Sequence, residues 1–131
     1  MLHRLAERLS PNGLLVRGGF HPRAGDDAPL LDDGTRPATL LLIGNAGPAM
    51  WHAFRTQPDR SGRHPLDDWL HGRIRSVAAD VGAGVRFPND GPPFVPIQDW
   101  AARAEPVHRS PIGLMIHPEY GLWHVYRAVL L

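Results

Sequence analysis

Apolar residues recur along the chain with two different spacings. Residues 2–9 place their leucines on one face of a helix, and a longer apolar stripe with the same spacing begins at residue 65. A further short helix is expected at 97–104. Pro48 suits the first turn of another helix, in which we expect Met50, Trp51 and Phe54 to face inward. The pattern therefore predicts four helices.

A continuous apolar run at 38–44 differs from these helical patterns. It is bounded by Pro37 and Gly44. Its length and its flanks are typical of a buried central strand. Shorter strands are predicted at 14–17 and 85–87.

The last part of the chain has the pattern of a β-hairpin. Its first arm is expected at 113–117, its turn at 118–121 and its second arm at 122–131. Gly121 suits the left-handed position that hairpin loops of three to five residues require.

Two loops rich in proline and glycine, at 20–37 and 88–96, separate the predicted elements. The length of 131 residues corresponds to one domain, since a domain usually takes about 100–200 residues. We therefore expect a single domain over 1–131. The mixture of elements predicts an α+β fold, with a small mixed or antiparallel sheet flanked by helices and a C-terminal hairpin.

Charge and composition exclude several functions. The net charge of +1 argues against a nucleic-acid binder with a broad basic face. The chain has no cysteine and no lysine, because all 14 basic residues are arginine. This excludes disulfides, iron–sulfur clusters or zinc held by cysteine, and Schiff-base chemistry. The remaining chemistry belongs to histidine, acids, tyrosine and arginine, or to a bound cofactor.

The sequence also bears on location. The first ten residues have no apolar region of the kind that secretory signals contain. The longest apolar run, 38–44, is far shorter than the roughly 20 residues of a spanning helix. We therefore expect a cytoplasmic protein.

Eight histidines raise the question of a metal site. None of them forms a known helical zinc motif. His64 and His71 share a helix face but lie two turns apart, which is too far to bind one ion. His117 and His124 flank the predicted turn and could approach each other. The alternative is that the histidines are partly exposed or cap helices, and we predict no metal ligand.

Arg127 is the most specific candidate. Strict alternation along the second hairpin arm places Arg127 on the same face as Val125 and Val129. A buried arginine is costly without an anionic partner. It could form a structural pair with an acid such as Glu105 or Asp99, or it could hold a carboxylate or phosphate of a ligand.

Three further features have both a structural and a functional interpretation. The glycine turn at 44–48 could present N–H groups to an anion, or it could simply join a strand to a helix. The acids at 67–68 could act in acid–base chemistry or stabilise a helix N-terminus. Trp123, Tyr120 and Tyr126 could line a pocket for a flat ligand or pack in the core.

A motif in 113–131 resembles a known family. The matching residues are Ile116, His117, Pro118, Gly121, Trp123 and Arg127. This spacing resembles the cobalamin-processing family, which comprises the cyanocobalamin decyanases and alkylcobalamin dealkylases of the flavin nitroreductase superfamily. Weaker similarities follow the same order upstream, at 38–54 and 64–67. The chain looks most like bacterial ferredoxin-like proteins of this superfamily, in which a cysteine-rich iron–sulfur half follows.

The resemblance implies a nitroreductase-like fold and a corrinoid pocket. The cofactor-binding residues that it implies are Arg127, Trp123, Tyr126, His117, Tyr120 and Gln98. Cobalamin is the implied cofactor, with FMN as the alternative, and no iron–sulfur cluster belongs to this chain. In the decyanases the matching arginine is associated with glutathione thiolate, so Arg127 is expected at an anion site.

Two functions are therefore expected. The first is a corrinoid- or flavin-binding domain, which, if it catalyses a reaction, takes its electrons from a separate donor. The second is a non-catalytic interaction module of the same fold that pairs with a ferredoxin-like partner. A homodimer is a further expectation, whereas nucleic acid and membrane are not expected partners.

Overall fold

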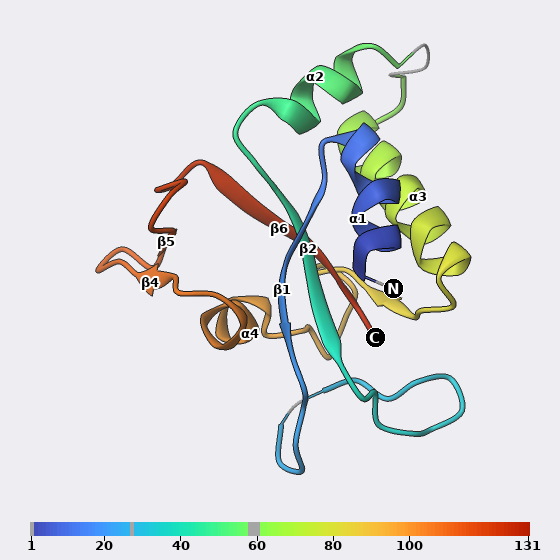
Figure 1. Ribbon diagram of the computed structural model, residues 1–131, viewed down its shortest axis with the longest axis vertical. Helices are drawn as coiled ribbons and strands as arrows, with labels where there is room; N and C mark the ends of the chain where they lie inside the picture. Colours follow the sequence, from blue (N-terminus) through green and yellow to red (C-terminus); the bar gives the residue numbers. More distant parts are fainter. Residues whose placement is uncertain (1, 27, 58–60) are drawn as a thin grey trace.

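An antiparallel sheet with helices on both faces forms the fold (Figure 1). The computed structural model describes residues 2–26, 28–57 and 61–131. Within these residues the helices are α1 (Leu2–Leu9), the 3₁₀ helix η1 (Ser10–Asn12), α2 (Ala49–Arg55), α3 (Pro65–Asp80) and α4 (Ile97–Ala104). The strands are β1 (Leu15–Phe20), β2 (Leu40–Ala46), β3 (Val85–Arg86), β4 (His108–Arg109), β5 (Met115–Ile116) and β6 (His124–Leu130). The α+β class predicted from the sequence is confirmed.

Strand β2 lies inside the main sheet, whose order is β1-β2-β6-β3. It pairs in antiparallel fashion with both β1 and β6. Leu40, Leu42 and Ile43 are fully buried. The central strand predicted at 38–44 is therefore confirmed, although it begins and ends slightly later.

Each face of the sheet has its own hydrophobic core. On one face, Ile43 and Ala128 pack against α1, α2 and α3. On the other face, Leu42 and Val129 pack against Trp100 of α4. Figure 1 shows α1 and α3 together on one side of the strands and α4 on the other. The helices thus cover both faces of the sheet.

The predicted helices are present, and α1 and α4 have the predicted bounds. The expectation for Trp51 is wrong, because its side chain is 51% exposed while Met50 and Phe54 are buried. A helix of two turns buries one stripe, and the i, i+4 pair of Met50 and Phe54 occupies it. Among the described residues, no helix is both long enough and apolar enough to cross a membrane.

Each of the two strands that flank β2 contains a β-bulge. In β1 the pairing skips Arg17, and in β6 it skips Arg127. A bulge inserts one residue and reverses the alternation of side chains. As a result Arg127 lies on the α3 side, beside Leu70, while Val129 lies on the α4 side. The prediction that Arg127 and Val129 share a face is therefore wrong.

The predicted C-terminal hairpin is present only as its turn. His117 and Gly121 exchange two backbone hydrogen bonds of 2.9 Å. The arms then separate, because β5 pairs with β4 while β6 pairs with β2 and β3. The physical reason is that the first arm is bonded elsewhere: Met115 and Ile116 pair with β4, and the carbonyl oxygen of Met115 accepts a hydrogen bond from the His124 side chain.

Candidate functional site

A buried ion pair between Arg17 and Glu105 lies at the centre of a polar cluster. Arg17 Nη2 lies 3.0 Å from Glu105 Oε2, and Arg17 Nε lies 3.3 Å from Oε1. The side chains are only 1% and 10% exposed. Two parallel hydrogen bonds of this kind fix the geometry of both groups. We call Arg17, Glu105, His117, His124 and Tyr126 the Arg17 cluster.

The local backbone explains why this pair forms. The β1 bulge turns Arg17 toward the α4 side, where Glu105 follows the last residue of α4. The next residue, Gly18, has φ +148°, and a Cβ there would lie 2.8 Å from the carbonyl oxygen of Ala104. Only glycine allows so close an approach of the two backbones. The sequence Arg17-Gly18 thus places the guanidinium beside Glu105.

Tyr126 completes the contacts of the Glu105 carboxylate. Its hydroxyl donates a 2.6 Å hydrogen bond to Oε2. Burial of the hydroxyl, this hydrogen bond and the charge of Glu105 raise the pKa of Tyr126 well above its ordinary value, and Arg17 opposes the shift. The guanidinium carbon of Arg17 lies 4.5 Å from the centroid of the Tyr126 ring, a cation–π distance. Tyr126 is therefore held as a protonated donor.

Both histidines of the cluster have assignable tautomers. His124 Nε2 lies 2.8 Å from the carbonyl oxygen of Met115, which only accepts, so Nε2 carries the proton. His124 Nδ1 then accepts from Arg17 at 3.2 Å. His117 Nδ1 accepts backbone N–H bonds of 3.0 and 3.2 Å from Glu119 and Tyr120.

The protons of His117 and His124 thus lie on Nε2, and Nε2 of His117 lies 3.8 Å from Glu105 Oε1. Their rings approach to 5.9 Å, so the predicted proximity of the two histidines is confirmed. The nitrogens that could accept a metal are already occupied by hydrogen bonds. Within the described residues, no group of three or more acids and histidines is arranged to hold a metal ion.

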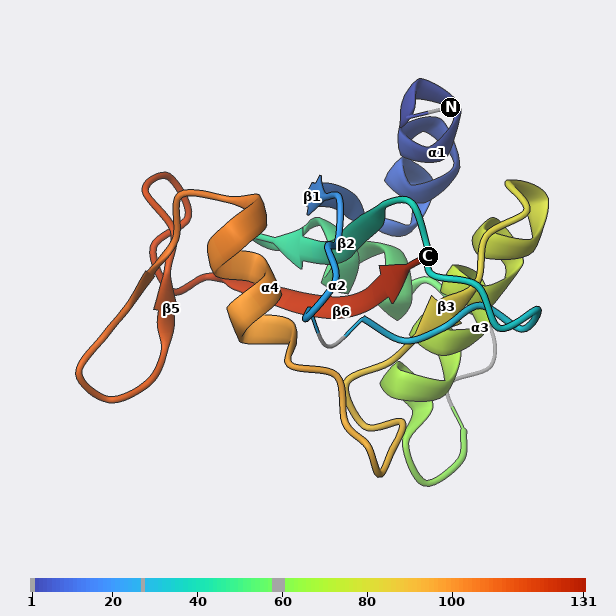
Figure 2. The ribbon, with the colours of Figure 1, turned by 90° about the horizontal axis from the view of Figure 1, so that it is seen from below.

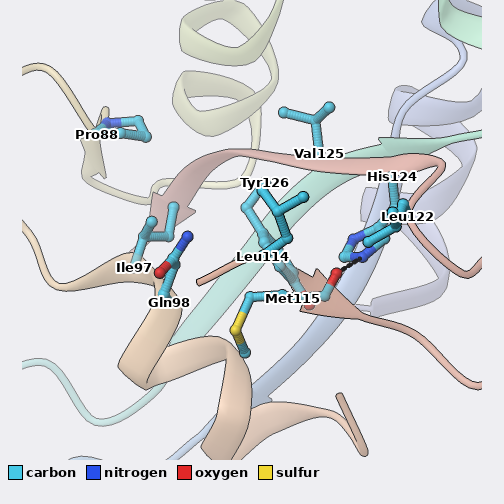
Figure 3. Close-up of a pocket in the computed structure, with 9 residues that line it drawn as sticks. All are labelled: Pro88, Ile97, Gln98, Leu114, Met115, Leu122, His124, Val125 and Tyr126. Atoms are coloured by element: carbon cyan, nitrogen blue, oxygen red, sulfur yellow. Dashed lines mark hydrogen bonds between the residues drawn. The ribbon is translucent and has the colours of Figure 1, made fainter. Parts of the chain in front are cut away.

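An apolar groove of about 270 Å³ lies against the Arg17 cluster (Figure 3). Elements α4, β5 and β6 and the loops beside them contribute its walls. Its lining residues are Pro88, Ile97, Gln98, Leu114, Met115, Leu122, His124, Val125 and Tyr126. In the described part of the chain the Gln98 amide has no hydrogen-bond partner, so it is available to a ligand. The groove therefore combines apolar walls with one free amide.

A second, more polar cavity of about 180 Å³ adjoins the groove. It is lined by Asp67, Leu70, His71, Pro88, Asn89, Tyr126 and Arg127. Pro88 and Tyr126 also line the groove, so the two cavities meet where β3 no longer covers β6. Together they form a continuous surface along the uncovered part of β6.

Arg127 lies in this second cavity. Its Nε donates a 2.9 Å hydrogen bond to Asn45 Oδ1. Burial lowers the pKa of Arg127 from its ordinary value, and the charge of Asp67 opposes the shift. Glu105 pairs with Arg17 and Asp99 pairs with Arg109, so neither proposed acid neutralises Arg127. No carboxylate of the described residues lies within ion-pair distance of it.

The other two candidate features have ordinary structural roles. In the turn at 44–48, the N–H of Gly47 donates to the carbonyl oxygen of Trp123 at 3.1 Å. Asp67 and Asp68 lie in the first turn of α3, where the helix dipole favours acids. Asp67 also faces the Arg127 cavity, so only this acid is connected to the site.

The six predicted cofactor-binding residues fall into four places. Gln98 and Tyr126 line the groove, and Arg127 lies in the adjoining cavity. His117 and Tyr120 stack on each other with ring centroids 4.5 Å apart, and they line neither cavity. Trp123, the sixth, is 66% exposed and lines neither cavity.

Sequence reasoning missed the central residue, Arg17. A charged residue at the end of an apolar strand pattern, followed by Gly18 and Gly19, is a signal for a bulge. His124 was noted only as a neighbour of His117, and Glu105 only as a partner for Arg127. The contact between Arg17, Glu105 and His124 depends on how α4 packs against β1. No local sequence pattern predicts that packing.

Comparisons with known proteins do not assign a function to this site. No protein-family model matches the chain, and no curated protein is significantly similar to it. The functional argument therefore depends on the site and on the motif in 113–131.

Proposed function

We propose that the chain binds a planar cofactor, cobalamin in the first place and FMN as the alternative, along the uncovered part of β6. The observation that carries this proposal is the pairing of an apolar groove with a half-buried arginine that has no acidic partner in the described residues. The ring would lie in the groove, and the phosphate that both cofactors contain would reach Arg127. The resemblance to the cobalamin-processing family, which implies a nitroreductase-like fold, supports the same proposal.

The groove fits part of such a ring rather than the whole of it. Its volume of about 270 Å³ is below the range of about 300–1,000 Å³ that encloses a drug-sized ligand. One face or edge of the ring would therefore contact Ile97, Leu114 and Met115 while the rest stays exposed. The Gln98 amide would bind a carbonyl or amide group on the ring periphery.

The chain's own residues would hold and orient the cofactor. Tyr126 and His124 form a fixed wall, because both are already bonded within the Arg17 cluster. Arg127 and Asn89 would contact the phosphate, and the charge of Asp67 would favour the charged form of the guanidinium when the cofactor is absent. The cofactor, when bound, supplies redox chemistry, and its electrons would come from a separate donor in the cytoplasm.

Absorbance titration of the protein with cyanocobalamin, cob(II)alamin and FMN tests this proposal. We expect a saturable spectral shift with at least one of them. The groove-filling variant Ile97→Trp should abolish the shift, while Leu30→Trp, on the exposed loop before β2, should keep it. The absence of both a spectral shift and thermal stabilisation with all three cofactors would refute the proposal.

A further inference from the structure

His71 of α3 lines the cavity of about 180 Å³ that also holds Arg127, and its ring is held there by packing. It stacks on Phe87, with the two ring centroids 3.9 Å apart. Phe87 is 1% exposed and follows β3, which lies beside α3 in Figure 2. The core thus fixes the ring of Phe87, and the stack fixes the imidazole.

The two ring nitrogens of His71 are free and accessible. Neither of them has a hydrogen-bond partner among the described residues. The half-buried and buried side chains in that part of the protein contain one polar atom that is sealed from solvent without a partner, and it is Trp69 Nε1. The nitrogens of His71 are therefore open to solvent or to a ligand.

Two further donor groups line the same cavity. Arg127 uses only Nε, on Asn45 Oδ1, so both of its Nη groups remain available. Asn89 lies in the turn after β3, which is closed by two hydrogen bonds of 3.0 Å between Phe87 and Asp90. Within the described residues the Asn89 amide has no partner. A guanidinium, an imidazole and an amide from three separate elements thus line one space.

The size of this cavity selects a small ligand group. Its volume of about 180 Å³ is well below the roughly 300 Å³ at which pockets for drug-sized ligands begin. It is also far above the roughly 15 Å³ that one water molecule requires. Guanidinium and imidazolium groups bind oxyanions through charge-assisted hydrogen bonds. A phosphate or sulfate group therefore fits both the space and the donors.

The charges in the cavity make the protonation of His71 decisive. Asp67, one helical turn before His71, lines the same cavity and opposes the positive charge of Arg127. Tyr126 is uncharged there, because its hydroxyl stays protonated. With a neutral His71 the lining groups carry no net charge, and a protonated His71 makes the cavity positive. Histidine changes its charge between about pH 5 and pH 8.

The other charged groups around His71 do not line the cavity. On α3, Asp68 lies in the first turn, and Arg75 places its guanidinium 4.9 Å from the centroid of the Phe87 ring. In the turn after β3, the carboxylate of Asp90 accepts the N–H of Phe87. The charge of the cavity itself therefore changes only with His71 in this pH range.

We propose that protonated His71 is a second cationic contact, beside Arg127, for a phosphate or similar oxyanion. Binding of the anion then takes up one proton from solvent onto the neutral imidazole, and it strengthens as pH falls. No bond within the ligand changes. The assignment of the anion to a cofactor rests on the proposed function, whereas the site for the oxyanion does not.

NMR titration of the cofactor-free protein with sodium sulfate, at constant ionic strength, tests this proposal. Sulfate keeps the same charge at about pH 5.5 and about pH 8, near the two ends of the histidine range, so any pH dependence comes from the protein. We expect the wild type to bind sulfate about tenfold or more tightly at the lower pH, as one additional charge-assisted hydrogen bond provides. His71→Gln should bind with the weaker affinity at both pH values.

His64→Gln is the matched control for that substitution. His64 immediately precedes α3 and lines neither cavity. The control variant should therefore keep the pH dependence of the wild type. Circular dichroism establishes that each variant is folded.

Asp67→Asn provides a second test that leaves His71 in place. It removes the charge that opposes Arg127, so the cavity is positive even with a neutral His71. The variant should bind sulfate more tightly than the wild type at about pH 8. Unchanged affinity of Asp67→Asn, equal wild-type affinity at the two pH values, or a pH dependence that survives in His71→Gln would overturn the proposal. So would full sulfate binding by Arg127→Met.

The outcome is separable from that of the cofactor titration, because the sulfate experiment contains no ring. Sulfate binding that depends on His71, without binding of cobalamin or FMN, supports the oxyanion site and refutes the proposed function. Cofactor binding without sulfate binding does the reverse. If the anion is the cofactor phosphate, His71→Gln will also weaken binding of FMN but not of riboflavin, and if it is free phosphate, the substitution will weaken neither.

Discussion

Arg17 and Arg127 are both bulge residues, one on each strand that flanks β2, and both donate hydrogen bonds to Asn45. Arg17 bonds the backbone carbonyl oxygen of Asn45 at 3.4 Å, and Arg127 bonds its side-chain oxygen at 2.9 Å. The two bulges thus send one guanidinium to each face of the sheet. Arg17 is neutralised by Glu105, whereas Arg127 is left facing a cavity.

The buried pair predicts a large effect of Glu105→Gln. The substitution keeps the shape of the side chain but leaves Arg17 buried without a counter-charge. Breaking such a pair costs about 3–5 kcal/mol of unfolding free energy. The control is Asp99→Asn, whose pair with Arg109 is more than half exposed and should contribute about 0–1 kcal/mol. Urea denaturation measures the free energy of unfolding of both variants. Equal losses would show that the charge of Glu105 does not stabilise the buried Arg17.

The two arginines should respond differently to replacement by methionine. Arg17→Met leaves Glu105 buried and unpaired, which should cost about 3–5 kcal/mol. Arg127→Met removes a guanidinium that has no acidic partner in the described residues, and leaves only Asn45 Oδ1 unsatisfied. Its cost should be about 1–2 kcal/mol. A larger loss for Arg127→Met, measured as the free energy of unfolding, would mean that Arg127 has a structural role.

The raised pKa of Tyr126 predicts how stability depends on alkaline pH. Unfolded tyrosine ionises near pH 10, and Tyr126 in the folded chain ionises above that. The stability from the protonated hydroxyl is therefore complete below about pH 10 and is lost as pH rises further. Tyrosinate absorbance should show an ionisation step above pH 10 that Tyr126→Phe removes. A wild type whose tyrosinate absorbance does not change when Tyr126 is replaced would contradict the prediction.

Close contact between β2 and β6 predicts that Gly44→Ala is poorly tolerated. A Cβ at Gly44 would lie 2.2 Å from the carbonyl oxygen of Val125, so the strands must separate beside the Arg127 bulge. We expect a loss of about 1–3 kcal/mol or more. Gly72→Ala provides the contrast, because Gly72 lies within α3 with open space around it. It should raise stability by about 1 kcal/mol. Thermal melting distinguishes the two, and a Gly44→Ala variant as stable as the wild type would refute the contact.

Local patterns were sufficient for the helices and for the buried strand. The bounds of α1 and α4 follow from apolar spacing within eight residues, and β2 follows from a run without polar interruption. These features depend on residues close together in sequence. They are therefore visible before any fold is known.

Pairing and register were not predictable in the same way. The segment after Gly121 looks like the arm of a hairpin, yet β6 pairs with β2 and β3 while β5 pairs with β4. The bulges at Arg17 and Arg127 then reverse the alternation that a sequence reading assumes. The Arg17 cluster was missed because its members come from four separate segments of the chain.

Binding of four ligands to the wild type and to Arg127→Met tests the central claim most directly. Cobalamin and FMN contain a phosphate, while riboflavin offers the flavin ring without it and cobinamide offers the corrin ring without the phosphate and the nucleotide base attached to it. If the ring lies in the groove and the phosphate at Arg127, calorimetric titration of the wild type will show tighter binding of the phosphate-containing member of at least one pair. Arg127→Met will reduce that preference while keeping affinity for the ring. If the wild type binds none of the four, or Arg127→Met keeps the full preference, the claim is wrong.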